Sequence, residues 1–164
     1  MKADELRALQ APLKDRYRSE PGAARVTLSA SSQLGEGIAC RIQTGKALVE
    51  AGLHPATGGD GSQACSGDML LEALAACYGV TMPAVATALG IELRGGTIVV
   101  EGDLDFRGTL GVAKDAPVGF EDIRVRAEID GDMTDEQRAA LAKLTERYCV
   151  VLQTLRSPPR LQVG

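Results

Sequence analysis

The chain has few of the residue types from which most metal and aromatic-lined sites are built. Among its 164 residues there is no Trp, only 3% are aromatic, and His54 is the one histidine. A single histidine without any C-x-x-C pair leaves no ligand set at the spacing of a zinc site. Because aromatics are scarce, the core must consist of Leu, Val, Ile and Ala. Hydrophobic residues make up 45% of the chain, enough for one domain over residues 1–164.

Clusters of basic residues are also missing. The formal net charge is −4 and no run of Lys or Arg occurs, which argues against nucleic acid as a partner. We see no basic-then-apolar leader and no uninterrupted apolar stretch of membrane length, so we expect a soluble cytoplasmic protein with no membrane partner. Cysteines in that compartment are normally reduced, and a disulfide there is more often transient than structural.

A nucleotide site is not indicated either. The glycine-rich segment 58–61 lacks the Lys-Ser/Thr ending of a P-loop and does not follow a clear strand. With no metal-ligand pattern and no phosphate-binding loop, we expect neither a metal nor an organic cofactor.

What is present is a mixed pattern of helices and strands. Apolar spacing predicts an amphipathic helix over residues 1–18, within an N-terminal extension of residues 1–20, and alternation predicts strands over 25–30 and 37–42. A long central helix is expected from Ser66 to Gly90, with a kink or break near Thr81 because Pro83 lacks a backbone donor.

The second half of the chain predicts two long strands, over 97–106 and 123–129, followed by a long helix. That helix opens at Thr134 with a capping-box sequence and ends before Pro158; residues 161–163 read as a last edge strand. The order of these elements predicts an α+β fold with helices packed on an antiparallel sheet.

Two of the four cysteines lie in the predicted helices, Cys77 in the central helix and Cys149 in the last one. Residues this far apart in sequence meet only through the tertiary fold. If they meet, one thiolate can be oxidised and the other can resolve it as a disulfide, which is the chemistry of a thiol peroxidase. The alternative is that each is a small hydrophobe on an apolar helix face, the commoner state of a free cysteine.

The other two cysteines carry weaker signals. Cys65 directly precedes the start of the central helix, where free backbone N–H groups can lower a thiol pKa, so it is either a second reactive thiol or a loop residue without a role. Cys40 alternates with Ile38 and Ile42 on a strand, and we assign it no function.

The segment 68–77, DMLLEALAAC, resembles the central-helix motif of the OsmC/Ohr family of thiol-dependent peroxidases. In that motif a carboxylate is followed by a Leu-rich turn, Ala-Leu with small residues, and the cysteine. Segment 58–61 resembles the family's linker into this helix. Segments 97–106, 120–129 and 148–152 resemble its two long strands and the helix of its second cysteine, so the resemblance runs from about Gly37 to the C-terminus.

The resemblance implies an OsmC-like fold, with two long central helices in an intertwined homodimer and the cysteine pair at or near the subunit interface. It also implies reduction of organic hydroperoxides with electrons from a dithiol. By this resemblance Cys77 is the peroxidatic cysteine and Cys149 the resolving one. The Leu-, Val- and Ala-rich surroundings of Cys77 independently favour an alkyl peroxide over hydrogen peroxide.

The family's peroxidases hold the first cysteine as thiolate with an Arg and a Glu. Their Pro-Glu at the start of the helix is replaced here by Ser66-Gly67-Asp68, so the acid is a shorter Asp. Arg41 is the best candidate for the Arg, with Arg25 as the alternative. Asp68 is about 13 Å from Cys77 along a straight helix, so it would act through the Arg or merely complement the helix dipole.

Two other functions stay open at this stage. The missing Pro-Glu motivates a non-catalytic OsmC-like dimer or small-molecule binding protein that has lost the peroxidase chemistry. A cysteine-nucleophile hydrolase is a third possibility, and it requires His54 within hydrogen-bond reach of Cys77.

Overall fold

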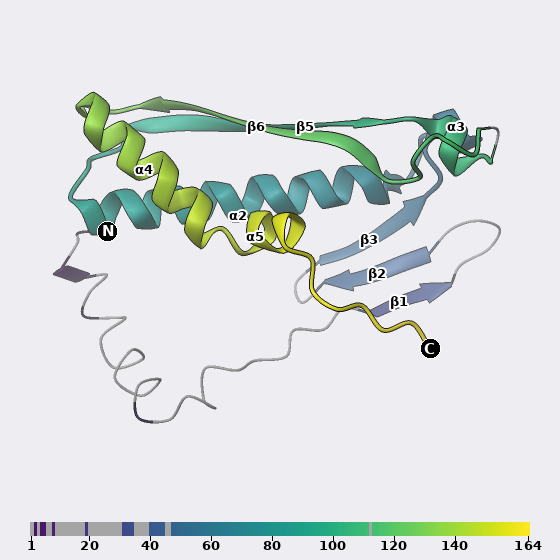
Figure 1. Ribbon diagram of the computed structural model, residues 1–164. Coiled ribbons are helices and arrows are strands. Elements are labelled where there is room, and N and C mark those ends of the chain that lie inside the picture. Colours follow the sequence, from purple (N-terminus) through teal and green to yellow (C-terminus); the bar gives the residue numbers. More distant parts are fainter. Residues whose placement is uncertain are drawn as a thin grey trace. The chain divides into compact units, whose positions relative to one another are not determined.

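A computed structural model of the chain describes residues 2, 4–5, 8, 19, 31–34, 40–44, 47–111 and 113–164 (Figure 1). The side chains of residues 31–34, 40–44, 47–48 and 107 are outside this description. The chain divides into two compact units. The first unit consists of Met1–Thr27, Leu74–Val99 and Arg126–Gly164, and the second of Leu28–Ala73 and Val100–Val125.

The second unit contains a four-stranded sheet. Its strands are β1 (Ser31–Leu34), β2 (Cys40–Thr44), β3 (Ala47–Gly52) and β4 (Ala64–Cys65), in that order. The first three are antiparallel, whereas β3 and β4 pair in parallel. The expected strand at 25–30 and most of the expected helix at 1–18 are outside the described residues, and the strand expected over 37–42 is described from Cys40 onward. Two short helices, η2 (Pro55–Thr57) and α3 (Phe106–Thr109), complete this unit.

The central helix α2 (Ser66–Leu89) runs through both units and continues past Pro83. Of the expected kink or break near Thr81, the break is therefore wrong, and the kink stays a prediction. The hydroxyls of Thr81 and Thr87 donate to the carbonyls of Cys77 and Pro83 at 2.7 and 2.8 Å, one turn back in each case. Gly90, at φ 71°, ends the helix in the left-handed conformation, as predicted. By length and composition alone α2 could span a membrane, a criterion that core helices of soluble proteins also meet.

The two long predicted strands are confirmed as β5 (Gly95–Leu104) and β6 (Phe120–Asp130), which form a two-stranded sheet. At the end of the hairpin in the first unit, Arg94 donates to Asp130 at 2.8 Å and to Asp132 at 2.7 Å. These exposed ion pairs join the residue before β5 to the end of β6.

The last predicted helix is two helices, α4 (Asp135–Tyr148) and α5 (Val150–Arg156). The capping box is confirmed, since Thr134 Oγ1 accepts from Gln137 N and Gln137 Oε1 accepts from Thr134 N. The expectation of one continuous helix is wrong, because Cys149 has an extended backbone at φ −72°, ψ 105°. The side-chain amide of Gln153 donates to the backbone carbonyl of Glu146 at 2.7 Å, so this carbonyl near the interruption has a hydrogen-bond partner. The edge strand expected over 161–163 is also wrong, since these residues form no strand.

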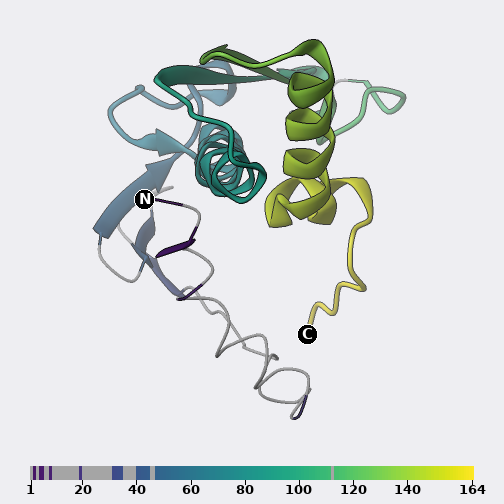
Figure 2. The same cartoon turned by 90° about the vertical axis from the view of Figure 1, so that its left-hand side faces the viewer.

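The core of the first unit lies where α2 and α4 pack together. Figures 1 and 2 show α4 beside the C-terminal part of α2, with this end of the β5–β6 hairpin covering both. The most buried side chains come from these helices and the residue between α4 and α5; they are Leu74, Tyr78, Met82, Ala86, Leu141, Thr145 and Cys149. The α+β class is therefore confirmed, and aliphatic side chains dominate the core as the composition predicts.

Candidate functional site

Cys77 and Cys149 lie next to each other in the first unit, both as free thiols. Cys77 comes from the middle of α2 and is half-buried. Cys149 is completely buried and occupies the interruption between α4 and α5. The two thiols are close enough for each to shift the pKa of the other.

The surroundings favour a thiolate at Cys77. Burial raises the pKa of the Cys77 thiol, but hydrogen bonds from the backbone N–H of Val151, the Cys149 thiol and the N–H of Val150 outweigh burial, so the pKa is lowered overall. These N–H groups belong to the first turn of α5 and have no acceptor within their own helix. The interruption at Cys149 therefore supplies the donors that stabilise the Cys77 thiolate.

Cys149 has the opposite acid–base character. Burial raises the pKa of its thiol, and the hydrogen bond to Cys77 and the negative charge on Cys77 raise it further, against N–H groups of Leu152 and Val151 that lower it. The opposite shifts make Cys77 the more acidic thiol of the pair and Cys149 the less acidic one.

Thr81, one turn after Cys77, adds a smaller contribution. Its hydroxyl lowers the pKa of Cys77 as the weakest of the hydrogen bonds to that sulfur. The same hydroxyl donates to the Cys77 carbonyl at 2.7 Å. One proton cannot serve both acceptors at full strength, so the carbonyl, at 2.7 Å, is the main partner of the hydroxyl.

A tyrosine and an ion pair lie beside the thiols. Tyr78 is 6% exposed, and burial together with the charges of Glu146 and Cys149 raises the pKa of its phenol, opposed by Arg156. Arg156 pairs with Glu146 at 3.0 Å. The guanidinium that acts on the Tyr78 phenol is thus itself paired with a carboxylate.

The remaining predicted site residues lie in the second unit. Asp68 is exposed in the first turn of α2. The backbone of Arg41 lies in β2, opposite Gln33 and Glu50, while its side chain, and all of Arg25, are outside the described residues. The predicted contact between Asp68 and an arginine therefore stays a prediction.

His54 and Cys65 also belong to the second unit, where they line a cavity of about 320 Å³ together with Asp68. The His54 ring stacks on Phe106 with centroids 4.9 Å apart, and its Nδ1 accepts from the N–H of Ala56 at 3.1 Å. His54 is the N-cap residue of η2, and this hydrogen bond from its side chain gives it a local structural role. In the described part of the chain no group of three His, Cys, Asp or Glu side chains is arranged to hold a metal.

Comparison with known proteins identifies the family. Residues 59–164, well over half of the chain, match the family model described as OsmC-like protein. The chain belongs to the OsmC-like family. No curated protein matches it in sequence.

Solved structures of OsmC-like proteins share its fold at low sequence identity. An OsmC-like protein from Mycoplasma pneumoniae superposes with a TM-score of 0.68 at 17% identity, covering 81% of this chain and 89% of the other. An organic hydroperoxide resistance protein OsmC from Legionella pneumophila gives 0.63 at 20% identity, covering 82% and 92%. One from Elizabethkingia anophelis gives 0.65 at 14%, covering 82% and 91%. At these identities the likeness shows the fold alone.

Sequence reasoning missed three contributors to this OsmC-like site: the N–H groups of Val150 and Val151, the Thr81 hydroxyl, and Tyr78. Thr81 and Cys77 share a helix face at a spacing of four, which was a usable signal for the hydroxyl. The N–H donors have no signal in the side-chain pattern, because they become free only where the backbone leaves the helix at Cys149.

Proposed function

We propose that this OsmC-like protein is a cytoplasmic thiol-dependent peroxidase that reduces organic hydroperoxides, with Cys77 as the attacking and Cys149 as the resolving residue. The observation that carries the proposal is the difference between the two thiols: the pKa of Cys77 is lowered and that of Cys149 is raised within one hydrogen-bonded pair. A peroxidatic cysteine must be a thiolate, whereas a resolving cysteine must keep its sulfur close and unoxidised.

The first step is attack of the Cys77 thiolate on the terminal oxygen of the hydroperoxide. The O–O bond breaks, the leaving alkoxide takes a proton to become the alcohol, and Cys77 becomes a sulfenic acid. Cys149 then attacks the Cys77 sulfur while giving up its proton, the hydroxide leaves as water, and a disulfide forms. A dithiol returns both sulfurs to thiols by exchange.

The apolar surroundings support an alkyl or aryl hydroperoxide as substrate. Tyr148 and Val150, on either side of Cys149, are 58% and 71% exposed and offer apolar surface next to the thiol pair. Hydrogen peroxide has no apolar group to bury against such surface. An alkyl group gains binding free energy there because it is removed from water.

The same proposal includes the intertwined homodimer with two long central helices, one from each chain. Val80 is 70% exposed on the apolar helix α2, and burying such apolar surface against a second chain would be favourable. The Legionella and Elizabethkingia structures are named for organic hydroperoxide resistance, which agrees with the proposed substrate class.

The test measures peroxide consumption and the mass of the product. Reduced protein is given one equivalent of cumene hydroperoxide or hydrogen peroxide without reductant. We expect faster reaction with cumene hydroperoxide and a product that has lost two hydrogens, the disulfide. Cys149→Ser should stop after gaining one oxygen, at the sulfenic acid, and Cys77→Ser should not react.

Cys65→Ser is the matched control, since it removes a half-buried thiol of the other unit and should retain full activity. Consumption of neither peroxide by the reduced protein would exclude the peroxidase and favour the alternative, an OsmC-like dimer that binds a small molecule without redox chemistry.

A further inference from the structure

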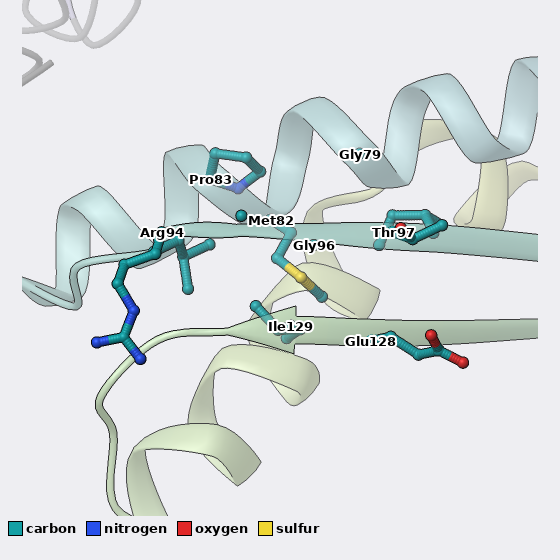
Figure 3. Close-up of a pocket in the computed structure, with 11 residues that line it drawn as sticks. Gly79, Met82, Pro83, Arg94, Gly96, Thr97, Glu128 and Ile129 are labelled. Atoms are coloured by element: carbon teal, nitrogen blue, oxygen red, sulfur yellow. The ribbon is translucent and has the colours of Figure 1, made fainter.

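The first unit contains a second feature suited to a ligand, a cavity of about 320 Å³ between α2 and the β5–β6 hairpin (Figure 3). Its volume is at the lower end of the range of small-molecule sites, about 300–1,000 Å³. Met82, Leu93, Ile98 and Ile129 provide most of its apolar wall, and Figure 3 shows Met82 directed from α2 toward the two strands.

Gly79 keeps this cavity open on the side of α2. Glycine in the interior of a helix is less stable than alanine by roughly 0.5–1 kcal/mol, so its presence calls for a reason. Packing does not supply one here: a Cβ on Gly79 would meet Ile98 Cγ1 at 3.8 Å, an ordinary van der Waals contact, and nothing closer. A side chain at this position would instead occupy the cavity.

The charges around the cavity are unequal. Arg94 and Glu128 extend from opposite ends of it (Figure 3). The Arg94 guanidinium is paired with two carboxylates, Asp130 and Asp132, at 2.8 and 2.7 Å, so it leaves no net positive charge at its end of the cavity. The Glu128 carboxylate has no cation against it within the described part of the chain, and Thr97 places a hydroxyl on the same wall. The cavity is therefore apolar along its length, with one uncompensated negative charge at one end.

We infer that this cavity binds a small amphiphilic cation, with its alkyl chain between Gly79, Met82 and Ile98 and its ammonium group at Glu128. The inference does not depend on the proposed peroxidase activity. A carboxylate ligand is disfavoured by Glu128, and a neutral ligand loses the charge interaction while keeping the apolar contacts.

The experiment measures binding of n-hexylamine, 1-hexanol and hexanoate to the full chain by isothermal titration calorimetry near pH 7, where the amine is protonated. We expect one hexylamine per chain, bound roughly two- to fivefold more tightly than hexanol, as for an exposed ion pair, with hexanoate the weakest. Absence of hexylamine binding would overturn the inference.

Two variants locate the ligand. Gly79→Leu fills the cavity and should weaken the binding of hexylamine and of hexanol alike by about tenfold or more, since the alkyl chain loses its buried contacts. Glu128→Gln should remove the preference for hexylamine over hexanol and leave hexanol binding unchanged. Unchanged binding in Gly79→Leu would overturn the site, and an unchanged preference in Glu128→Gln would overturn the role of the carboxylate.

Matched controls separate these effects from damage to the fold. Leu89→Met changes an exposed apolar residue of α2 outside the cavity, and Glu121→Gln removes an exposed carboxylate of β6 that does not line it. Neither should alter binding. Gly79→Ala should raise the thermal unfolding temperature and keep most of the affinity, so a graded loss from Gly to Ala to Leu reports occupancy of the cavity.

Discussion

At the scale of single residues, two cysteines of the same chain differ in acidity because the backbone around them differs. Cys77 accepts hydrogen bonds from the N–H groups of Val151 and Val150 and from the Cys149 thiol, and these lower its pKa despite burial. Cys149 is buried beside a negative charge, which raises its pKa. These opposite shifts are the reason why we propose Cys77 as the attacking and Cys149 as the resolving sulfur.

This difference predicts how the alkylation rate of Cys77 depends on pH. In a Cys40→Ser, Cys65→Ser background, the rate with iodoacetamide should reach half its maximum below the ordinary thiol pKa of about 8.5. Cys149→Ala removes a donor and should move that midpoint upward, whereas Cys149→Ser keeps a hydroxyl donor and should move it less. A wild-type midpoint at or above the ordinary value would contradict the thiolate at Cys77.

Thr145 is a second residue whose surroundings make a prediction. Its side chain is completely buried one turn before Cys149, and Oγ1 has no hydrogen-bond partner in the described residues. A buried unpaired hydroxyl is unfavourable by about 1–3 kcal/mol. Thr145→Val keeps the shape and should raise the free energy of unfolding by about 1 kcal/mol or more, measured by urea denaturation.

The control for that variant is Thr154→Val. The Thr154 hydroxyl is exposed and donates to the Val150 carbonyl at 2.8 Å, so its removal should leave stability unchanged or slightly lower it. If Thr145→Val destabilises the protein instead, Oγ1 has a hydrogen-bond partner such as a bound water, and the prediction that this hydroxyl is unpaired would be wrong.

At the scale of elements, the sequence predicts the ends of helices most reliably where hydrogen bonds or backbone conformation of nearby residues determine them. The start of α4 follows from Thr134 and Gln137 satisfying each other's backbone donors, and the end of α2 follows from Gly90. The interruption at Cys149 was not predictable in the same way. Val150 and Val151 continue the apolar pattern, and neither glycine nor proline marks the change of direction.

Pro83 shows the opposite error. Locally it predicts a break, because it removes one backbone donor from the helix. The helix nevertheless continues to Leu89, with Met82, Val85 and Ala86 buried on both sides of the proline. Tertiary packing thus outweighs a local preference. The candidate site depends on the other error, because the helix that leads to Cys149 does not continue through it.

The capping box of α4 can be tested on its own. Thr134→Ala removes the acceptor for the Gln137 N–H at 3.2 Å and should lower the free energy of unfolding by about 0.5–2 kcal/mol. Thr134→Ser retains a hydroxyl and should recover most of the loss, as measured by thermal or urea unfolding. Equal destabilisation by both substitutions would mean that packing of the threonine methyl, and not the cap, stabilises this end.

At the scale of the whole molecule, a disulfide between Cys77 and Cys149 would connect two segments about 70 residues apart. Closing a loop of this length restricts the unfolded chain and is worth up to about 4 kcal/mol of stability if the native geometry is unstrained. For a chain of this size, each kcal/mol corresponds to a change of about 2–4 °C in Tm.

We therefore predict that oxidation with one equivalent of cumene hydroperoxide raises the Tm by several degrees and that dithiothreitol reverses the change. The interruption at Cys149 favours an unstrained bond, because the residue that must approach Cys77 has an extended backbone and lies between two helices. Cys149→Ser should abolish the rise, while Cys65→Ser should keep it. A lower Tm on oxidation, with the disulfide verified by mass, would mean that the bond forms only by distorting α2 or α5, and the reduced arrangement would then be the more stable resting state of the protein.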